Sequence, residues 1–550
     1  VLGWLRGYDR GVLGADVLAG LTAAAVVLPK AMAYATVAGL AAQVGLYAAL
    51  VPPIAYAALG RSPVLSVSTS TTIGILVGSA LAAALPGADP AQLAVGAATL
   101  SVMVGLVLVA AAVLRFGFVA NFISEPVLAG FKAGIGLVIV VDQVPKLLGV
   151  HIEKAGFFRD LAAIVRASRE TSPATLAVSA AAIGTIVLLK RWVPRLPAAL
   201  VAVAAGIAAS ALLGLPAAGV KTIGTIPAGL PALVVPEVGL LESLWPAALA
   251  VALMSFTETV ASGRAFTREG QARPAPNAEL VATGVANALG GLTGAMPAGG
   301  GTSQTLVALR AGARTQLAGL VVGLAALATA LLLAPALSLM PQAVLASIVV
   351  IYSIELVSVR DFRAILAVRR TEFVWAVVAF AGVLLLGTLR GILVAVVTSV
   401  LALAHQASNP AVYEVARKRG THAYRRRPAE HADDETWPGL LLVRVEGRIF
   451  FANTERVLDL VAPLVQARAP RVIVLDCSAL FDLEYSALKM LSEVEARMRR
   501  RGAQLWLAAL NPEVRAVVER SPLGKALGHD RTFLGLDDAV EHFQARGGAS

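Results

Sequence analysis

Two short polar runs interrupt long apolar stretches of this chain. Residues 67–72 read VSTSTT, and residues 300–305 read GGTSQT. Each run leads into a short apolar segment, over residues 73–81 and 306–309. Serine and threonine oxygens cap the starts of helices, and glycine lets the backbone turn without steric cost. Each run is therefore predicted to begin a short helix.

Two such helix starts, facing each other near the centre of a membrane, would form an anion site. The start of a helix leaves about four backbone N–H groups unpaired and carries roughly half a positive charge. Discontinuous helices place such ends around the substrate in secondary transporters, and no arginine is required. The two runs therefore predict a transporter built around a site between them.

The composition is that of a polytopic membrane protein. Of the 550 residues, 57% are hydrophobic and 15% are charged, whereas a soluble domain carries about 25% charged residues. A spanning helix needs about 20 apolar residues, so the longest window without a charged residue suffices for two. Such windows cover residues 31–60, 90–114, 171–189, 196–220 and 315–354.

The net charge of +11 does not require a nucleic-acid partner. Much of it lies in short loops beside apolar segments, as the positive-inside rule expects for cytoplasmic loops. We therefore predict a lipid bilayer as the surroundings and no nucleic acid as a partner. These basic residues are Arg115, Lys190, Arg191, Arg268, Arg369 and Arg370.

The apolar segments divide into two halves of similar design. After a cytoplasmic lead-in over residues 1–16, residues 17–410 hold about fourteen predicted crossings, with a Pro-rich connection over residues 225–236. Each half opens with an apolar segment that carries one charged residue, Lys30 or Glu258. Ser70 follows Lys30 by 40 residues, and Ser303 follows Glu258 by 45. Matching interrupted segments in two halves predict an inverted-repeat transporter.

The remaining chain has the pattern of a soluble domain. Residues 411–436 are charged, include Arg425-Arg426-Arg427 and are predicted to be a linker that is either solvated or near anionic headgroups. Residues 437–550 are predicted to form a small cytoplasmic α/β domain, because strands alternate with amphipathic helices. Cys477, the single cysteine, is predicted to lie in a buried strand. The predicted strands and helices cover residues 440–445, 454–466, 472–475, 487–500 and 504–508.

Several motifs resemble the SulP anion permeases, a family of sulfate, bicarbonate and dicarboxylate transporters that also includes prestin. The resemblance extends in order over nearly the whole chain, and its last part is similar to the STAS domain shared with anti-sigma-factor antagonists. The motifs are PKAMAYA (29–35), AGL (38–40), GLY (45–47), FVANFISEPV (118–127), GF (130–131), GTIPAGLP (224–231), GARTQLAG (312–319), DCS (476–478) and residues 482–488.

The resemblance implies an all-α membrane domain of fourteen segments in two inverted seven-segment repeats. Segments 3 and 10 would be half-helices, and a core domain would move against a gate domain. It also implies a homodimer, with the STAS domain contributing dimer contacts and regulation. The high Ala, Gly and Arg content suggests a bacterial source, which would place the protein in the cytoplasmic membrane.

The resemblance also assigns candidate site residues. Lys30 stands where many members have glutamine, and Gln304 where some have arginine. Ser303 matches a pocket serine, and Glu258 matches an acidic residue implicated in proton or cation coupling. Lys132 and Asp142 are interpreted as structural or gate residues. The expected substrate-binding residues are Lys30, Tyr34, Thr69, Ser70, Thr71, Thr302, Ser303 and Gln304.

Two charged residues and one serine leave alternatives open. Lys30 either contacts the anion or extends to the membrane interface. Glu258 either couples transport or is a loop-facing carboxylate near Arg264. In our hypothesis Lys30 and Glu258 neutralise each other in the empty site, and Glu258 takes a proton when an anion claims Lys30. Ser486 is either a phosphorylatable regulatory residue or an ordinary helix N-cap.

These features favour secondary active transport of a small inorganic or dicarboxylate anion, coupled to protons rather than sodium. The alternatives are an uncoupled anion uniporter or channel and a membrane-anchored signalling scaffold that acts through the STAS domain. A nucleobase symporter would favour carboxylates at its site, which Lys30 argues against. No catalytic set, metal spacing or phosphate loop is visible, so neither an enzyme nor a cofactor is predicted.

Overall fold

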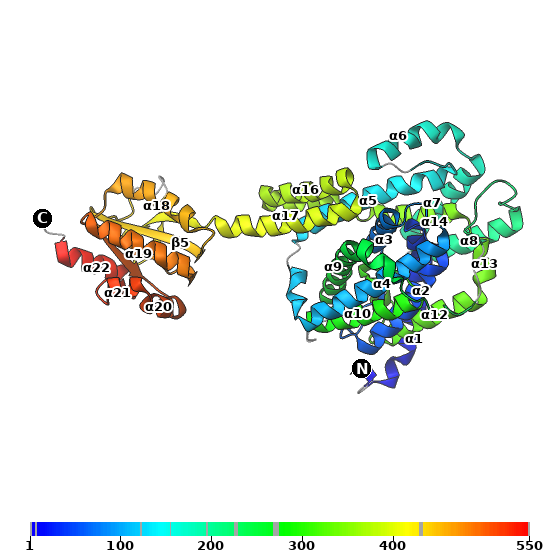
Figure 1. Ribbon diagram of the computed structural model, residues 1–550, viewed down its shortest axis with the longest axis horizontal. Helices are drawn as coiled ribbons and strands as arrows, with labels where there is room; N and C mark the ends of the chain where they lie inside the picture. Colours follow the sequence, from blue (N-terminus) through cyan, green and yellow to red (C-terminus); the bar gives the residue numbers. More distant parts are fainter. Residues whose placement is uncertain are drawn as a thin grey trace. The chain divides into compact units, whose positions relative to one another are not determined.

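The computed structural model describes residues 3–5, 8–121, 124–153, 156–193, 196–224, 229–267, 274–427 and 433–547. The chain forms two compact units, Val1–Val400 and Leu401–Ser550 (Figure 1). Several predicted features fall outside the described residues. They are residues 1, 2, 6 and 7 of the lead-in, Phe122 and Ile123 of one motif, residues 225–228 of the Pro-rich connection, Arg268, and residues 428–432 of the predicted linker.

The described part of the first unit is mostly helical, with one two-stranded pairing and an isolated bridge between Thr222 and Pro341. Its first half contains α1 (Leu13–Val37), α2 (Ala42–Leu59), α3 (Thr71–Ala84), α4 (Pro90–Val113), α5 (Glu125–Leu148), α6 (Phe157–Ala167), α7 (Pro173–Trp192) and α8 (Ala198–Leu213). Its second half contains α9 (Leu241–Ala265), α10 (Pro276–Leu292), α11 (Thr302–Arg310), α12 (Leu317–Leu332), α13 (Ala334–Ser338), α14 (Gln342–Ile354), α15 (Val359–Val368) and α16 (Arg370–Leu386). The helix α17 (Thr388–Ser408) follows, and the strands are β1 (Val67–Ser68) and β2 (Gly299–Gly300).

The helices confirm a polytopic membrane domain. Among the described residues, eight helices are long and apolar enough to cross a membrane. Each predicted crossing overlaps one helix, and α3 and α11 are short because they begin within the bundle. The sequence did not predict α6, α13 and α15; α6 buries only Ile164, and α15 buries none of its residues.

Helix boundaries follow local signals in the sequence. Asp89 caps α4 in a capping box with Gln92, and Pro90 occupies the first turn, where its missing N–H costs nothing. Ser124 caps α5 by accepting from the N–H of Val127, without a capping box, and Gly149 ends that helix at φ 72°, a conformation that favours glycine. Local signals therefore account for the start of α4 and for both ends of α5, although the N–H of Ser124 also donates to Ser399 of α17.

The two halves pack as an inverted repeat. The helix α1 packs on α12, and its counterpart α9 packs on α4; likewise α2 packs on α12 and α10 on α4. The short helices follow the same symmetry, because each packs on the first helix of the other half: α3 packs on α9, and α11 packs on α1. Between them, β1 and β2 pair antiparallel, Val67 opposite Gly300 and Ser68 opposite Gly299. A two-fold axis through such a pair exchanges the halves.

Buried amides fasten the chain before each short helix. The side-chain Nε2 of Gln316 donates to the carbonyls of Ser62 (2.8 Å) and Leu65 (2.9 Å), just before β1. In the other half, Asn287 accepts from the N–H of Ala298 (2.8 Å) and donates to its carbonyl (3.0 Å), just before β2. Short pairings in a membrane require such satisfied polar groups.

The predicted lead-in ends too late in the chain. The helix α1 already begins at Leu13, and Asp16, expected in a polar lead-in, is fully buried. Its carboxylate accepts from the N–H of Arg314 (2.6 Å) and from the N–H (3.1 Å) and hydroxyl (2.6 Å) of Thr315. Asp16 is therefore a structural partner of the loop before α12.

Two motif glycines mark close helix contacts. A Cβ on Gly45 would lie 2.1 Å from the carbonyl oxygen of Ala31, and one on Gly130 would lie 2.0 Å from that of Ala376. Any side chain at these positions would separate α2 from α1 and α5 from α16. Small residues allow this close packing where apolar burial against lipid provides no driving force.

The C-terminal unit is an α/β domain, as predicted. A mixed sheet has the order β4-β3-β5-β6-β8-β9, and β7 also pairs with β5. Alternate residues of the central strands face α18–α21 on one side and α22 on the other. The strands are β3 (Ala411–Arg417), β4 (Tyr424–Arg426), β5 (Leu440–Ile449), β6 (Val472–Asp476), β7 (Leu480–Leu483), β8 (Gln504–Ala508) and β9 (Thr532–Phe533). The helices are α18 (Thr454–Arg468), α19 (Tyr485–Arg500), α20 (Pro512–Glu519), α21 (Pro522–Leu527) and α22 (Leu536–Gly547).

The predicted linker over residues 411–436 is wrong in its described part. It forms β3 and β4, and β3 pairs with β5. The arginine run belongs to this sheet: Arg425 binds Asp434 through two 2.8 Å hydrogen bonds, and Arg427 lies 3.1 Å from Glu414. Composition misled the prediction, because edge strands carry many charged residues.

Replacing the buried amide of Gln316 tests the fastening before β1. Gln316→Leu leaves the carbonyls of Ser62 and Leu65 without their donor, which costs roughly 2–4 kcal/mol. We expect a lower thermal midpoint of the purified protein in detergent, measured by intrinsic fluorescence. Gln43→Leu is the control, because the Gln43 side chain makes no hydrogen bond to the described residues. Equal midpoints for the two variants would contradict this role.

Cys477 is fully buried one residue beyond β6 rather than within a strand. Burial raises the pKa of its thiol, and the charge of Asp476 raises it further. The reactive thiolate is therefore absent in the folded domain even at pH 9. We expect maleimide labelling only after denaturation, measured by mass spectrometry. Ser478→Cys in a Cys477→Ser background, at an exposed neighbouring position, should label at once in the folded protein.

Candidate functional site

The predicted site residues line one cavity of about 320 Å³ in the first unit. The cavity lies where α3 and α11 begin, so both halves of the repeat contribute to its wall. Residues from α1, α5, α9 and α14 complete it, together with Asp361 and Phe362 of α15. All nine predicted substrate and coupling residues line it: Lys30, Tyr34, Thr69, Ser70, Thr71, Glu258, Thr302, Ser303 and Gln304.

Two helix starts point their first turns at this cavity. Ser70 is the N-cap of α3, and its hydroxyl accepts from the N–H of Ile73 at 3.2 Å. Gly301 is the N-cap of α11, and its backbone N–H donates to the carbonyl of Ser66 at 2.9 Å. The next residues, Thr71 and Thr302, carry N–H groups that an intrahelical partner cannot satisfy.

Polar side chains hold these starts in place. Ser68 donates to Gln304 Oε1 at 2.9 Å, which ties β1 to the first turn of α11. The hydroxyls of Ser262 and Thr302 lie 2.8 Å apart. Thr69 Oγ1 is buried and has no hydrogen-bond partner among the described residues. It is therefore a polar group of the wall without a protein partner there.

The structure does not form the ion pair that we predicted between Lys30 and Glu258. Glu258 instead accepts from the hydroxyl of Ser70 at 2.8 Å. The ammonium of Lys30 donates to Ser303 Oγ at 3.2 Å and lies 3.6 Å from the ring centroid of Tyr352. Lys30 is only 5% exposed, so it does not extend to an interface. The carboxylate and the ammonium thus face the cavity with separate partners.

Charged and aromatic residues in and beside the wall were missed or assigned elsewhere. Tyr352 and Glu355 line the cavity from the end of α14, and Lys132 lines it from α5. Lys190, interpreted only as a topological charge, lies 2.6 Å from Glu355 and 4.0 Å from the ring centroid of Tyr352. The sequence did contain a signal for these wall residues, because Tyr352 and Glu355 lie three residues apart where an apolar segment ends.

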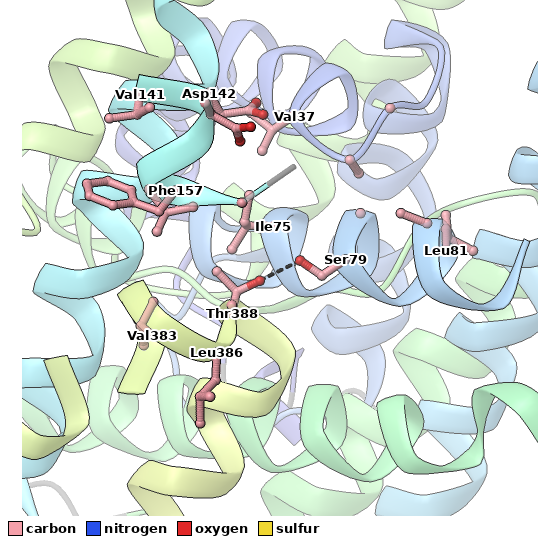
Figure 2. Close-up of a pocket in the computed structure, with 18 of the residues that line it drawn as sticks. Val37, Ile75, Ser79, Leu81, Val141, Asp142, Phe157, Val383, Leu386 and Thr388 are labelled. Carbon is pink, nitrogen blue, oxygen red and sulfur yellow. Dashed lines mark hydrogen bonds between the residues drawn. The ribbon is translucent and has the colours of Figure 1, made fainter. Parts of the chain in front are cut away.

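A second cavity, of about 790 Å³, lies at the other end of α3. Figure 2 shows its apolar wall from α3, α5, α6 and the turn between α16 and α17, with Asp142 at one side. A hydrogen bond between Ser79 and Thr388 crosses from α3 to α17. Asp142 therefore does not line the same cavity as Lys132, although both belong to α5.

Ser486 does not cap α19. The N-cap is Glu484, which makes no side-chain cap hydrogen bond, and Ser486 is the second residue of the helix. The prediction of an ordinary N-cap is therefore wrong, while a regulatory role of Ser486 stays a prediction. Within the described ranges, no group of three or more His, Cys, Asp or Glu residues is placed to hold a metal ion.

Comparisons with known proteins identify the family of the chain. Residues 13–379 match the sulfate permease family, and residues 431–539 match the STAS domain. A probable sulfate transporter of Mycobacterium tuberculosis is 34% identical over 554 residues, which covers 98% of this chain and 97% of that protein.

Solved structures share the fold. The murine anion transporter Slc26a9, in its inward-facing state, superposes with a TM-score of 0.91 at 24% identity, over 99% of this chain and 93% of that one. The transmembrane domain of the cyanobacterial bicarbonate transporter BicA gives a TM-score of 0.61 at 26% identity, over 72% of this chain and 98% of that one. This chain is a multi-pass membrane protein and a member of the sulfate permease family, with a C-terminal STAS domain.

Proposed function

We propose that this protein is a proton-coupled secondary transporter of a small oxyanion, with sulfate as the first candidate. The observation that carries the proposal is the meeting of two helix starts and a buried ammonium at one cavity. The first turns of α3 and α11 supply backbone donors, and Lys30 supplies an ammonium group. The family membership supports anion transport, and the similarity to a probable sulfate transporter of Mycobacterium tuberculosis supports sulfate.

The cavity wall carries charges of both signs, because the carboxylates of Glu258, Glu355 and Asp361 line it beside two ammonium groups. An anion is therefore favoured there when a carboxylate is protonated or paired. Lys30 and Lys132 bring two ammonium groups to the wall, and Lys132 is close enough to Glu258 for its charge to act on that carboxylate. Glu355 forms an ion pair with Lys190, which reduces its repulsion of an anion. The hydroxyls of Thr69 and Thr71 add donors. Bicarbonate and dicarboxylates are the other candidates within this class.

Glu258 is the proposed proton carrier. It is held by Ser70, the residue that caps α3, so its charge and the helix start are linked through one hydroxyl. A dianion entering beside an ionised Glu258 is repelled, whereas a protonated Glu258 removes that repulsion. Proton uptake by Glu258 therefore favours anion binding. This linkage couples the proton gradient to the anion gradient. The proton remains our choice over sodium.

The helices suggest which parts move. The helices α1–α4 and α9–α12 pack mainly among themselves, and α5, α7, α14 and α16 pack as a second group. The groups meet where α1 contacts α14 and α3 contacts α5. We propose that the first group is the core domain and the second the gate domain. The homodimer, the cytoplasmic side of the STAS domain and its regulatory role stay predictions.

Replacing Lys30 tests the anion site. In proteoliposomes, Lys30→Gln should raise the KM for sulfate about tenfold or more, because a buried charge opposite an anion contributes at least about 1.4 kcal/mol. Lys30→Arg, which keeps the charge, should transport better than Lys30→Gln. Uptake of labelled sulfate, bicarbonate and fumarate would be compared. Unchanged uptake of all three in Lys30→Gln would contradict the assignment.

Replacing Glu258 tests the coupling. In wild-type vesicles an inward proton gradient should drive accumulation of the anion above equilibrium. In Glu258→Gln this accumulation should be lost, while anion exchange without a gradient should persist, because glutamine imitates the protonated acid. Gradient-driven accumulation by Glu258→Gln would exclude this carrier. Uptake by the wild type that ignores the gradient and carries current would favour the uniporter or channel instead.

A signalling scaffold is the alternative from another class. It predicts that the protein's function survives both Lys30→Gln and Glu258→Gln, since neither residue lies in the STAS domain.

A further inference from the structure

The ring of Tyr352 contacts two ammonium groups at once. The Nζ atom of Lys30 lies 3.6 Å from the ring centroid, and the Nζ atom of Lys190 lies 4.0 Å from it. The three residues come from three helices, α1, α14 and α7. A ring face attracts cations through its quadrupole, and the attraction is strongest where water is excluded. The ring is therefore a shared partner of a cavity lysine and a lysine outside the cavity wall.

The two lysines differ in how their charges are balanced. Lys190 lies 2.6 Å from the carboxylate of Glu355, and its side chain is 33% exposed. Lys30 is 5% exposed, and the ion pairs of the described residues do not include it. Its protein contacts are the hydroxyl of Ser303 and the ring of Tyr352. In the described part of the chain, the ammonium that faces the cavity is thus held without a direct ion pair.

An aromatic ring is better suited than a carboxylate to hold the ammonium of Lys30 beside an anion site. A carboxylate would neutralise the ammonium and compete with an arriving anion for it. The ring holds the ammonium in place without forming an ion pair with it. An ammonium has three N–H donors, and Ser303 accepts only one of them. The remaining donors stay available to a ligand.

We propose that Tyr352 is a positioning residue that holds the ammonium of Lys30 at the anion site from the gate side. This inference rests on the proposed anion-binding function of the cavity and goes beyond it. Lys30 belongs to α1 in the proposed core domain, whereas Tyr352 belongs to α14 in the proposed gate domain. Movement of the two domains relative to each other therefore makes or breaks the contact between the ring and Lys30. That contact in turn sets the affinity of the cavity for an anion. Glu355 keeps Lys190 from repelling the cavity lysine.

Two substitutions of Tyr352 distinguish the effect of its aromatic face from the effect of its side-chain volume. Tyr352→Phe keeps the ring face and should leave the Kd for sulfate, measured by titration calorimetry in detergent, within about twofold of wild type. Tyr352→Leu keeps an apolar side chain without the quadrupole and should raise the Kd about tenfold. In proteoliposomes the KM should rise with the Kd, while the maximal rate changes less. Tyr47→Leu, a tyrosine of α2 outside the cavity wall, is the matched control.

A double-mutant cycle distinguishes positioning from a general structural effect. If Tyr352 acts through Lys30, Tyr352→Leu should raise the Kd of Lys30→Met by less than about twofold. Additive losses, or equal Kd values for Tyr352→Phe and Tyr352→Leu, would overturn the inference, provided that both variants keep wild-type thermal midpoints. A lowered midpoint of Tyr352→Leu with an unchanged Kd would overturn it as well.

The proposed function can fail separately in the same experiment. If wild-type protein neither binds nor transports sulfate, bicarbonate or fumarate, the anion site itself is wrong, and the inference about Tyr352 falls with it. If the wild type binds one of these anions and the Tyr352 variants bind it equally well, only the inference fails.

Discussion

The antiparallel pairing of β1 with β2 is the constraint on which the membrane unit depends. Two residues from each half meet there, and each strand leads within a few residues into a short helix. Because the pairing satisfies backbone groups inside a bundle without water, it allows two helices to begin there. Without it, α3 and α11 would expose unpaired backbone groups, and no cavity with two helix starts would exist.

The polar residues around this pairing form one continuous support. Gln316 and Asn287 fasten the chain before each strand, and Ser70 joins the start of α3 to Glu258. A change in the charge of Glu258 is therefore transmitted directly to a helix cap. The coupling proposed between proton and anion needs no long pathway, because the carboxylate, the cap and the cavity share one hydroxyl.

Sequence reasoning recovered the parts that depend on local chemistry. The polar runs around Ser70 and Ser303 predicted helix starts. The similar spacings from Lys30 to Ser70 and from Glu258 to Ser303 predicted a structural repeat. It failed where partners come from distant segments. Lys190 was interpreted as a loop charge, but it contacts Glu355 and Tyr352. Arg425 was assigned to a linker, but it forms an ion pair with Asp434.

By itself the sequence determined the class of the protein, because apolar length, helix caps and motif glycines act within a few residues or a single helix contact. The polar runs at the two short helices, together with the family resemblance, also identified most of the residues that line the cavity. Only the tertiary structure decided how the charges are paired. An ammonium such as Lys30 can reach several partners from one backbone position, and packing of α14 against α1 selected the ring of Tyr352 over the carboxylate of Glu258.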